Sequence, residues 1–451
     1  MKGKKRISLS TTQIIMLSFV LVILMGSLLL SLPISSADGV AVPYLDALFT
    51  ATTATCVTGL VTLTTATAWS GFGQVVILVL IQVGGLGVIT VMSGLMMLLN
   101  RKMGIGDRLL LQDAFNLNTL SGLGEFVKKV LIGTFVIEGI GALLYMTVFV
   151  PEFGVRGIWI AIFNSISAFC NAGMDIIGDS SLYNYATNPT INLTTSALII
   201  LGGIGYIVWW DVIRVFGSRR RGSIFGRLTL QSRIAIIASL VLVLLGGGLI
   251  FLFEYSNPET VGSLSLIDKI QVSLFQSVTT RTAGFASIPQ ESLSDPSAIV
   301  CLVLMFIGGS PVGTAGGIKT VTAVVLIASA IANIKGKSEV TLLNRRVSKS
   351  AIEKAAAVCT MSFGIFLLST LLLSAVCEAS LMDVIYETAS ATATVGLTRG
   401  LTPTLPDMGK IIVIVTMYLG RVGPISLALA LNGSKKSTNL VKNPIEEISI
   451  G

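Results

Sequence analysis

Four short stretches of this sequence carry a glycine in nearly the same setting: TCVTGL at 55–60, FCNAGM at 169–174, TRTAGF at 280–285 and TATVGL at 392–397. Successive glycines of the set are 114, 111 and 112 residues apart. An aromatic residue precedes each glycine by nine or ten positions, and the pairs are Phe49 with Gly59, Phe163 with Gly173, Phe275 with Gly284, and Tyr386 with Gly396. A period this constant predicts four copies of one structural unit.

A second set of motifs repeats in the same register: GGLG at 84–87, GGIG at 202–205, GGSP at 308–311 and GRVG at 420–423. These motifs begin 25, 29, 24 and 24 residues after the first glycine of their unit. One glycine in an apolar helix means little. Two sets of four in register indicate a repeat that extends over most of the chain.

Apolar segments of two lengths alternate around these motifs. Eight are long enough for the roughly 20 helical residues that cross a bilayer, and they centre on 13–34, 75–99, 130–150, 193–213, 234–253, 298–332, 355–376 and 411–431. Four are too short, at 46–56, 157–170, 268–280 and 383–394, and re-entrant helices are the natural alternative. The predicted fold is an all-α integral membrane protein of four tandem span, re-entrant pore helix, span repeats around a central pore.

The basic residues favour eight spans over twelve. Of the 31 lysines and arginines, 24 lie at 2–6, 101–129, 214–233, 335–354 and 435–442. Two crossings per repeat put all of these clusters on one side of the membrane, as the positive-inside rule prefers. We therefore expect a multi-pass plasma (inner) membrane protein with both termini cytoplasmic. The segment at 13–34 follows basic residues like a signal peptide but lacks a convincing cleavage site, so we interpret it as a retained span.

The expected domains follow from this topology. They are a cytoplasmic tail (1–11), repeat A (12–100, pore loop 46–60), a cytoplasmic loop (101–129), repeat B (130–217, pore loop 157–174), a cytoplasmic loop (218–233), repeat C (234–334, pore loop 268–285, loop 308–319), a cytoplasmic loop (335–354), repeat D (355–431, pore loop 383–397) and a cytoplasmic tail (432–451).

The composition excludes several classes of function. Among 451 residues, 53% are hydrophobic and 12% charged, whereas a soluble domain carries about a quarter charged residues. There is no histidine, and the five cysteines form no CxxC pair, so packing explains them better than redox or metal chemistry. No base, nucleophile or metal cluster indicates an enzyme. The net charge of +8 lies in loops, which favours solvated cytoplasmic segments over nucleic-acid binding.

The repeated loop glycines suit the lining of a narrow ion path. Backbone that turns its carbonyls inward often needs conformations that a Cβ disfavours, and rings of carbonyl oxygens replace the hydration shell of a monovalent cation. The short helices would point their partly negative ends at the pore, with Asp46, Asp268 and Asp383 near three of the opposite ends. The alternative is that the glycines serve only close helix packing. A secondary transporter with inverted repeats would need mid-membrane acids, for which Glu138 is the fair candidate.

These residues resemble the Trk/Ktr/HKT superfamily of potassium transporters, most closely the KtrB membrane subunit of Ktr-type uptake systems. The resemblance covers about residues 10 to 430 and is carried by DALFTATTATCVTGL, SISAFCNAGM, RTAGF, ATVGLTRGLTP, MFIGG with GGIK downstream, and GRVGP. It implies potassium transport through a selectivity filter with one glycine per repeat. The implied filter residues, acting through backbone carbonyls, are Thr55, Cys56, Val57, Thr58, Gly59, Cys170, Asn171, Ala172, Gly173, Arg281, Thr282, Ala283, Gly284, Ala393, Thr394, Val395 and Gly396.

The resemblance also implies partners and ions. It predicts a membrane homodimer and a cytosolic KtrA-like RCK ring that binds ATP or ADP and gates the pore. This chain has no GxGxxG followed by an acidic residue in a βαβ setting, so the nucleotide is expected on a separate chain. Potassium is the expected substrate, bound at the filter, with sodium open as an activator and no covalently bound cofactor. A sodium-selective or ion-coupled cation symporter on the same scaffold is the alternative function.

The sixth apolar segment is interrupted by GGSPVGTAGGIK at 308–319. Five glycines and a proline cannot continue a helix, since each glycine costs about 1 kcal/mol and proline about 3 kcal/mol. The matching loop of the resembled family is an intramembrane gate that usually starts GAGSxST, and Pro311 is expected to stiffen it; a packing kink is the alternative. The gate residues are Gly308, Gly309, Ser310, Pro311, Val312, Gly313, Thr314, Ala315, Gly316, Gly317 and Lys319, with Arg421.

Two cations lie inside predicted spans, where burial of a charge usually marks function. Lys319 ends the interrupted segment, and Arg421 replaces the second glycine of its motif. Symmetry places Arg421 beside the pore, where it would repel a second cation or hold the gate loop by hydrogen bonds to its carbonyls. By contrast, Arg156, Lys269 and Lys410 are near outer helix ends and are expected to be solvated.

Two further arginines flank filter glycines by three residues, Arg281 before Gly284 and Arg399 after Gly396. Either each forms an outward ion pair with Glu387 or another loop acid, or it tunes the pore entrance. Glu138 is expected to face the bundle and to be paired rather than to bind an ion.

Overall fold

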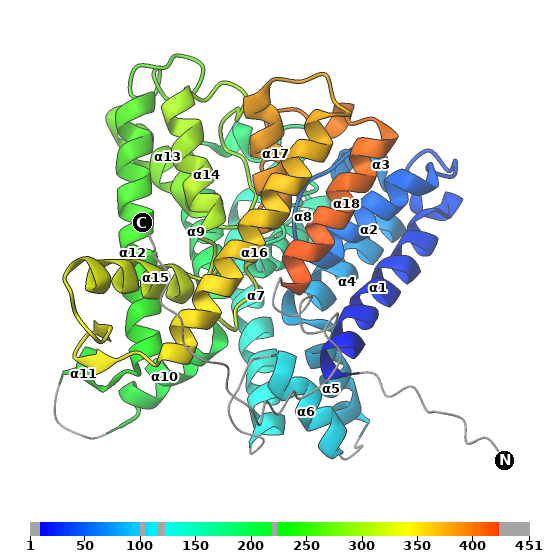
Figure 1. Cartoon of the computed structure of the whole chain (residues 1–451). Helices are drawn as coiled ribbons and strands as arrows, with labels where there is room; N and C mark the ends of the chain where they lie inside the picture. The colour runs from blue at the N-terminus through cyan, green and yellow to red at the C-terminus, as the bar shows by residue number, and fades with distance from the viewer. Residues whose placement is uncertain (1–9, 100–103, 115–121, 219–222, 424–451) are drawn as a thin grey trace.

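The computed structural model describes residues 10–99, 104–114, 122–218 and 223–423. Nearly all of its regular structure is helical, as expected (Figure 1). The described strands form one hairpin, β1 (Thr341–Leu342) with β2 (Arg345–Arg346), whose two turn residues have positive φ.

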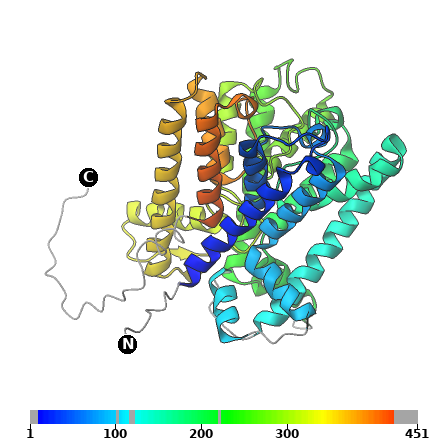
Figure 2. The same cartoon turned by 90° about the vertical axis from the view of Figure 1, so that its right-hand side faces the viewer.

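Four long helices are apolar enough to cross a membrane by themselves: α1 (Thr11–Leu30), α7 (Leu123–Phe153), α12 (Leu230–Glu254) and α16 (Lys349–Ser374). Hydroxyl side chains begin three of them, because an unpaired N–H group at a helix start needs an acceptor. Ser10 accepts from Gln13 N, Thr229 from Ser232 N, and Ser348 from Ala351 N. Figure 2 shows α1 and α7 tilted, whereas α16 stands upright beside α18 (Asp407–Val422).

The second spans of repeats A and B are bent, which corrects the straight spans expected at 75–99 and 193–213. Helix α4 (Gly71–Leu86) turns by 99° into α5 (Val88–Leu98), and α9 (Pro189–Gly203) by 94° into α10 (Tyr206–Phe216). The bends fall at Gly87 and Gly205, whose φ angles of +85° and +94° no helical residue adopts.

The other two repeats break at the same register. In repeat C the loop at 307–319 separates α14 (Asp295–Phe306) from α15 (Thr320–Ile334). In repeat D, α18 ends before Gly423, which has a φ of +86°. Repeats A, B and C therefore share the interruption, and in repeat D the helix ends at the same register. What is particular to repeat C is that Pro311 replaces the last glycine of the motif and a longer loop follows.

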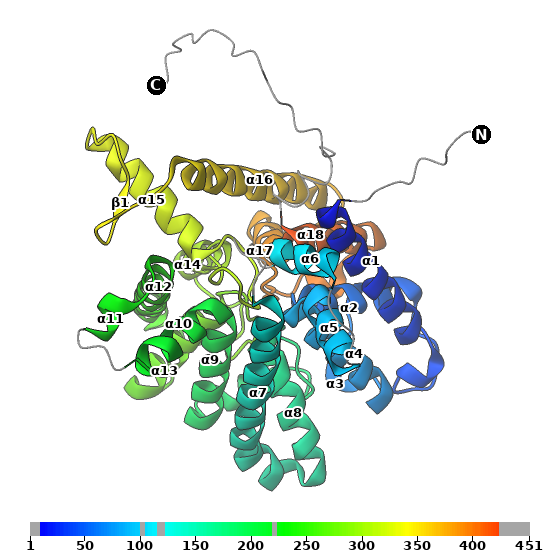
Figure 3. The ribbon, with the colours of Figure 1, turned by 90° about the horizontal axis from the view of Figure 1, so that it is seen from below.

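The four short helices begin two residues earlier than the predicted re-entrant segments and end within one residue of them. They are α2 (Tyr44–Cys56), α8 (Val155–Cys170), α13 (Leu266–Thr279) and α17 (Leu381–Ala393). The aromatic residue of each, Phe49, Phe163, Phe275 and Tyr386, is at most 1% exposed. Viewed from below, the four units lie around a common centre, each with one short helix beside its long helix (Figure 3).

The remaining helices are short connections, namely α3 (Thr65–Ala68), α6 (Ile105–Ala114) and α11 (Ile224–Arg227), with 3-10 turns at 33–35, 183–185 and 402–404. Helices α5, α6 and α11 mark the lower face in Figure 1, and the short pore helices begin toward the upper face. Four described helices, or six elements if each bent pair is one span, meet the length for a crossing. The count of eight spans and four dips therefore stays a prediction.

Candidate ion path and gate

Each loop has a left-handed residue two positions before its glycine, and this residue directly follows the helix in repeats A, B and D but lies three residues after it in repeat C. These residues are Val57 (φ +56°), Asn171 (+61°), Thr282 (+68°) and Thr394 (+51°). A left-handed cap turns the chain sharply away from the helix axis. Three of the four loops therefore leave their helices in the same way, and the loop of repeat C makes its left-handed turn three residues after its helix.

The four loop glycines form a closed ring. A Cβ on Gly59 would lie 2.5 Å from Ala172 O and 3.2 Å from Gly396 Cα. A Cβ on Gly173 would lie 2.8 Å from Gly284 Cα, and one on Gly284 would lie 3.1 Å from Gly396 Cα. Every loop thus touches the backbone of the next loop around the centre, and their φ angles of +63° to +102° favour glycine.

Hydroxyl groups anchor three of the loops. Gly59 N donates to Thr53 Oγ1 and Gly396 N to Ser390 Oγ, each at 2.9 Å, and Met174 N donates to Ser167 Oγ at 3.1 Å. The repeat pattern in the sequence does not show which hydroxyl groups hold the loops. In addition, the buried hydroxyls of Thr55, Thr58, Thr392 and Thr394 have no hydrogen-bond partner within the described chain.

The loop at 308–319 is closed at its base by a short neck. Ile307 and Ile318 form a parallel bridge, and Gly308 N donates to Ile318 O at 3.0 Å. From this neck the loop reaches the break in repeat B, where Ser310 N donates to Gly203 O at 2.8 Å. Tyr206 N, at the start of α10, donates back to Val312 O at 2.9 Å. The loop thus uses backbone groups that the bend between α9 and α10 leaves free.

The tip of this loop lies against the ends of the pore helices. Thr314 Oγ1 is 3.0 Å from Phe169 O and 3.2 Å from Asn171 Oδ1. Gly316 N donates to Thr282 Oγ1 at 3.2 Å, and a Cβ on Gly316 would lie 2.6 Å from Ala393 O. One loop therefore contacts the filter segments of repeats B, C and D from the side where the helices end.

Arg421 bridges this loop and repeat A. Its Nη1 donates to Thr314 O at 2.6 Å, and its Nη2 donates to Gly84 O and, at 3.4 Å, to Gly85 O. Lys319 donates to Ala315 O at 2.6 Å within the loop. A guanidinium has donors enough for several carbonyls at once, so Arg421 is bonded to both structures.

A cavity of about 430 Å³ lies against the loop. It is lined by most of 311–319, by 85–90 and 419–423 at the helix breaks, and by side chains of α1, α15 and α16. The loop at 308–319 therefore contacts the segments that carry the glycine ring and also lines the cavity.

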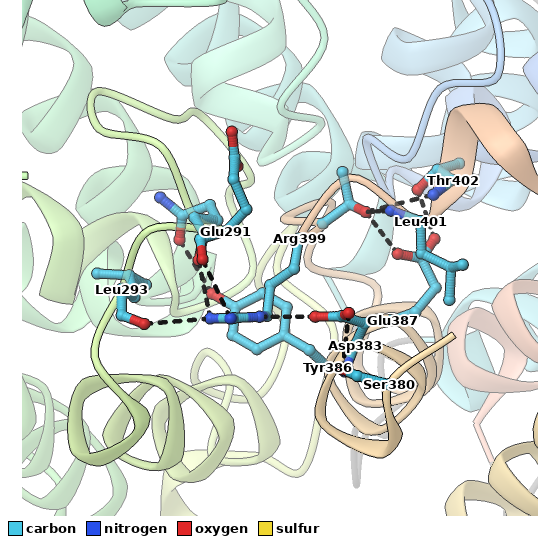
Figure 4. Close-up of polar contacts among 11 residues, drawn as sticks. Glu291, Leu293, Ser380, Asp383, Tyr386, Glu387, Arg399, Leu401 and Thr402 are labelled. Atoms are coloured by element: carbon cyan, nitrogen blue, oxygen red, sulfur yellow. Dashed lines mark hydrogen bonds and ion pairs between the residues drawn. The ribbon is translucent and has the colours of Figure 1, made fainter. Parts of the chain in front are cut away.

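The two arginines that flank loop glycines differ in their partners. Arg399 Nε pairs with Asp383 Oδ1 at 2.9 Å, and its other nitrogens donate to backbone carbonyls at 290, 291 and 293 (Figure 4). Glu387 is fully buried and accepts instead from the hydroxyls of Thr398 and Thr402. The expected ion pair with Glu387 or another loop acid is confirmed for Arg399, whose partner is Asp383 because the threonines already satisfy Glu387, and it is wrong for Arg281. Arg281 points into the protein and pairs with no described acid.

Two of the three outer cations are buried rather than solvated. Lys410 Nζ lies 2.7 Å from Asp46 Oδ1, with side chains 14% and 12% exposed. Lys269 Nζ donates to Tyr255 O at 2.7 Å and lies 4.1 Å from that ring's centre. Arg156 is exposed, as expected. The expectation was wrong for both lysines because their partners come from other helices.

The Lys410–Asp46 pair closes the contact between repeats D and A. Lys410→Met alone should lower the free energy of unfolding by roughly 2 kcal/mol, since a mostly buried carboxylate then loses its partner. The measurement is the melting temperature in detergent. The double variant Asp46→Asn with Lys410→Met should recover part of the loss. Equal melting temperatures for Lys410→Met and the native chain would contradict this view of the pair.

Glu138 faces the bundle, as expected, and is 4% exposed. It accepts from Gln82 Nε2 at 3.1 Å, so its partner on α4 is an amide and not a cation. Among the described residues there is no cluster of three or more histidine, cysteine or acidic side chains, and the five cysteines are free.

Comparisons with known proteins find matches that extend over nearly the whole chain. A family model described as TrkH, cation transport protein, matches residues 3–442. The chain is 38% identical to Ktr system potassium uptake protein B of Bacillus subtilis, over 99% of this chain and 98% of that protein. It is 37% identical to potassium/sodium uptake protein NtpJ of Enterococcus hirae, over 100% and 99%.

The same fold occurs in a solved structure, that of the potassium transporter TrkH from Vibrio parahaemolyticus. The TM-score is 0.75 at 18% identity, over 95% of this chain and 85% of that one. The fold and the matches define the class of this protein: it is a membrane protein that transports ions, and it is not an enzyme. Within that class the chain belongs to the TrkH family of cation transport proteins, which confirms the resemblance drawn from its motifs.

Proposed function

We propose that this protein is the pore-forming subunit of a potassium uptake system in the plasma membrane. The closed ring of Gly59, Gly173, Gly284 and Gly396 carries the proposal, because it brings four backbone loops to one axis. The names of the relatives from Bacillus subtilis and Enterococcus hirae support potassium as the ion. With the basic lower face cytoplasmic, both termini lie inside the cell.

In this function the carbonyls of 55–59, 170–173, 281–284 and 393–396 replace the hydration shell of the ion. Short helices that end at the ring turn their partly negative ends toward the cation. Buried threonine hydroxyls without protein partners add oxygen ligands or hold water along the path. The loop at 308–319 is the gate, and Arg421 holds it under the ring.

A cytosolic subunit that binds ATP or ADP would regulate the gate. The word "system" in the relatives' names implies more than one component. Basic segments at 214–233 and 335–354 offer a docking face for an RCK ring. A homodimer would use α16, whose most apolar stretch is 11% buried, against 28–33% in the other three long helices.

The function is tested by rubidium tracer flux into liposomes that hold the purified protein. We expect flux that excess potassium blocks and excess sodium does not. When a candidate RCK subunit is added, the flux should differ between ATP and ADP. A protein that gives no flux above empty liposomes, with or without partners, would disprove the pore. Flux indifferent to nucleotide, without a co-purified complex, would disprove the partner.

A sodium-selective pore or an ion-coupled symporter is the second candidate, favoured by the name of the Enterococcus relative. The same liposomes separate the candidates. Sodium that competes as well as potassium indicates a sodium path. Rubidium uptake that requires an inward sodium gradient, and not merely sodium, indicates coupling.

A further inference from the structure

Arg281 is a buried cation without an acidic partner among the described residues. Its side chain is 7% exposed and comes from the end of pore helix α13. Nη2 donates to Ser239 Oγ at 3.1 Å and to Gly308 O at 3.3 Å, and Nη1 to Ser239 O at 3.5 Å. Burial of a charge that only neutral oxygens hold costs free energy. A buried arginine of this kind therefore calls for a functional explanation.

The charge occurs in one repeat of the four. At the corresponding position, three residues before the ring glycine, the other repeats have Cys56, Cys170 and Ala393, all small and at most 2% exposed. Repeat C, which has the arginine, is also the repeat with the long loop. Packing around the filter therefore does not require an arginine here, since three of the four sites are filled without one.

The arginine bonds a backbone carbonyl at a position where repeats A and B also have a carbonyl bonded from another segment. Where a helix breaks, the carbonyls of its last turn lose their helical donors. Gly84 O receives Arg421 Nη2, Gly202 O receives Thr314 N, and Gly308 O receives Arg281 Nη2. Gly308 is the first residue of the loop, so Arg281 bonds its hinge, whereas Arg421 bonds its tip.

The surroundings leave little room at this hinge. A void of about 10 Å³, about the least that holds one water, lies between Arg281, Ser239, Gly309 and α9. Arg281 Nε is buried and has no partner in the described part of the chain. The guanidinium thus keeps an unused donor beside the loop.

We propose that Arg281 is a positioning residue for the gate loop: the contacts Ser239–Arg281–Gly308 fix the hinge of the loop to the scaffold of repeat C, and release of Gly308 O accompanies opening. The role rests on the proposed function of the loop as a gate. It adds a second arginine, which bonds the first residue of the loop, whereas Arg421 bonds Thr314. Because Arg281 also belongs to the filter segment, its side chain links the hinge directly to the ring.

The test compares Arg281→Gln, Arg281→Lys and Ser239→Ala in the rubidium flux assay without the partner subunit. Arg281→Gln should raise resting flux about tenfold, which corresponds to about 1.4 kcal/mol, while the rubidium-to-sodium ratio stays within about twofold. Ser239→Ala should give a smaller increase, and Arg281→Lys should partly restore the resting level. Lys269→Gln is the matched control, a buried cation on the same helix that does not contact the loop. It should lower the melting temperature without raising flux.

A second readout follows the loop itself. Val312→Cys, in a chain whose Cys359 and Cys377 are replaced by alanine, reports how fast a maleimide reaches the loop from the lower face. Arg281→Gln and Ser239→Ala should both accelerate labelling, and Lys269→Gln should not. If Arg281→Gln fails to fold, Ser239→Ala alone decides the matter. Flux and labelling at native rates in the folded variants, or flux that rises only with loss of selectivity, would overturn the proposal. Absence of flux in the native protein would instead count against the pore.

Discussion

Replacing Gly396 by serine is expected to reduce the preference for potassium over sodium by about tenfold, or about 1.4 kcal/mol, or to stop uptake altogether. Gly396 has a φ of +100°, which L-residues rarely adopt. A Cβ there would lie 2.8 Å from Gly59 Cα and still closer to the carbonyl of Thr58. The side chain would therefore push on the carbonyl oxygens that we propose replace the ion's hydration shell.

The measurement is rubidium flux with sodium competition, at matched protein in the liposomes. Gly400→Ser is the control, because Gly400 has a φ of +89° but nothing within 4 Å of an added Cβ. It shares the backbone strain and lacks the intrusion into the ring. Gly284→Ser should behave like Gly396→Ser. Unchanged selectivity for serine at all four ring positions would remove the filter assignment.

The pore helices could be placed from the sequence because two independent signals agree on them. Each is too short to span, and each is followed by a glycine at a fixed distance from a buried aromatic residue. The repeated motif predicted the end of each helix to within one residue, because three of the helices end in a left-handed cap two residues before the glycine and the fourth ends three residues before its left-handed residue. The starts were each placed two residues late, because they were read from the apolar pattern; Ser265 and Ser380, which cap α13 and α17, mark two of the starts, and the other two have no side-chain cap.

The bends at Gly87 and Gly205 were not predicted, although both glycines were part of a recognised motif. A glycine inside an apolar segment is compatible with a packed straight helix and with a break. Hydropathy does not separate the two, since both halves of the segment remain apolar. The positive φ of these glycines is visible in three dimensions alone, and it is the feature that frees the carbonyls of the preceding turn.

The partners of the charged residues were the least predictable feature. Lys410 and Asp46 are 364 residues apart in the chain, and Arg421 and Thr314 are 107 apart. Lys410 was expected to be solvated because it lies near a helix end. Asp46 of the neighbouring repeat A pairs with it instead, and the lysine is largely shielded from solvent. Symmetry did place Arg421 beside the loop, because its position within the repeat is known even where its partners are not.

Removing the gate is expected to raise resting rubidium flux about tenfold or more while selectivity is retained. Deletion of Val312 to Gly316 removes the part of the loop that contacts Phe169 and Asn171. The neck between Ile307 and Ile318 remains outside the deletion, so the flanking helices keep their connection. Arg421→Ala should act in the same direction, since it removes the donor that joins Thr314 O to repeat A.

Lys410→Met is the matched control for Arg421→Ala, because both residues lie on α18 but Lys410 contacts Asp46 and not the loop. If loss of stability in α18 were enough to open the pore, Lys410→Met would raise flux as well. We expect flux to rise in the two gate variants alone, with less dependence on a partner subunit. Flux that fell to background in both gate variants, with a correctly assembled protein, would show that the loop supports conduction. The ring would then have to conduct with the loop in place, and the contacts of Thr314 with Phe169 and Asn171 would belong to the open path rather than to its closure.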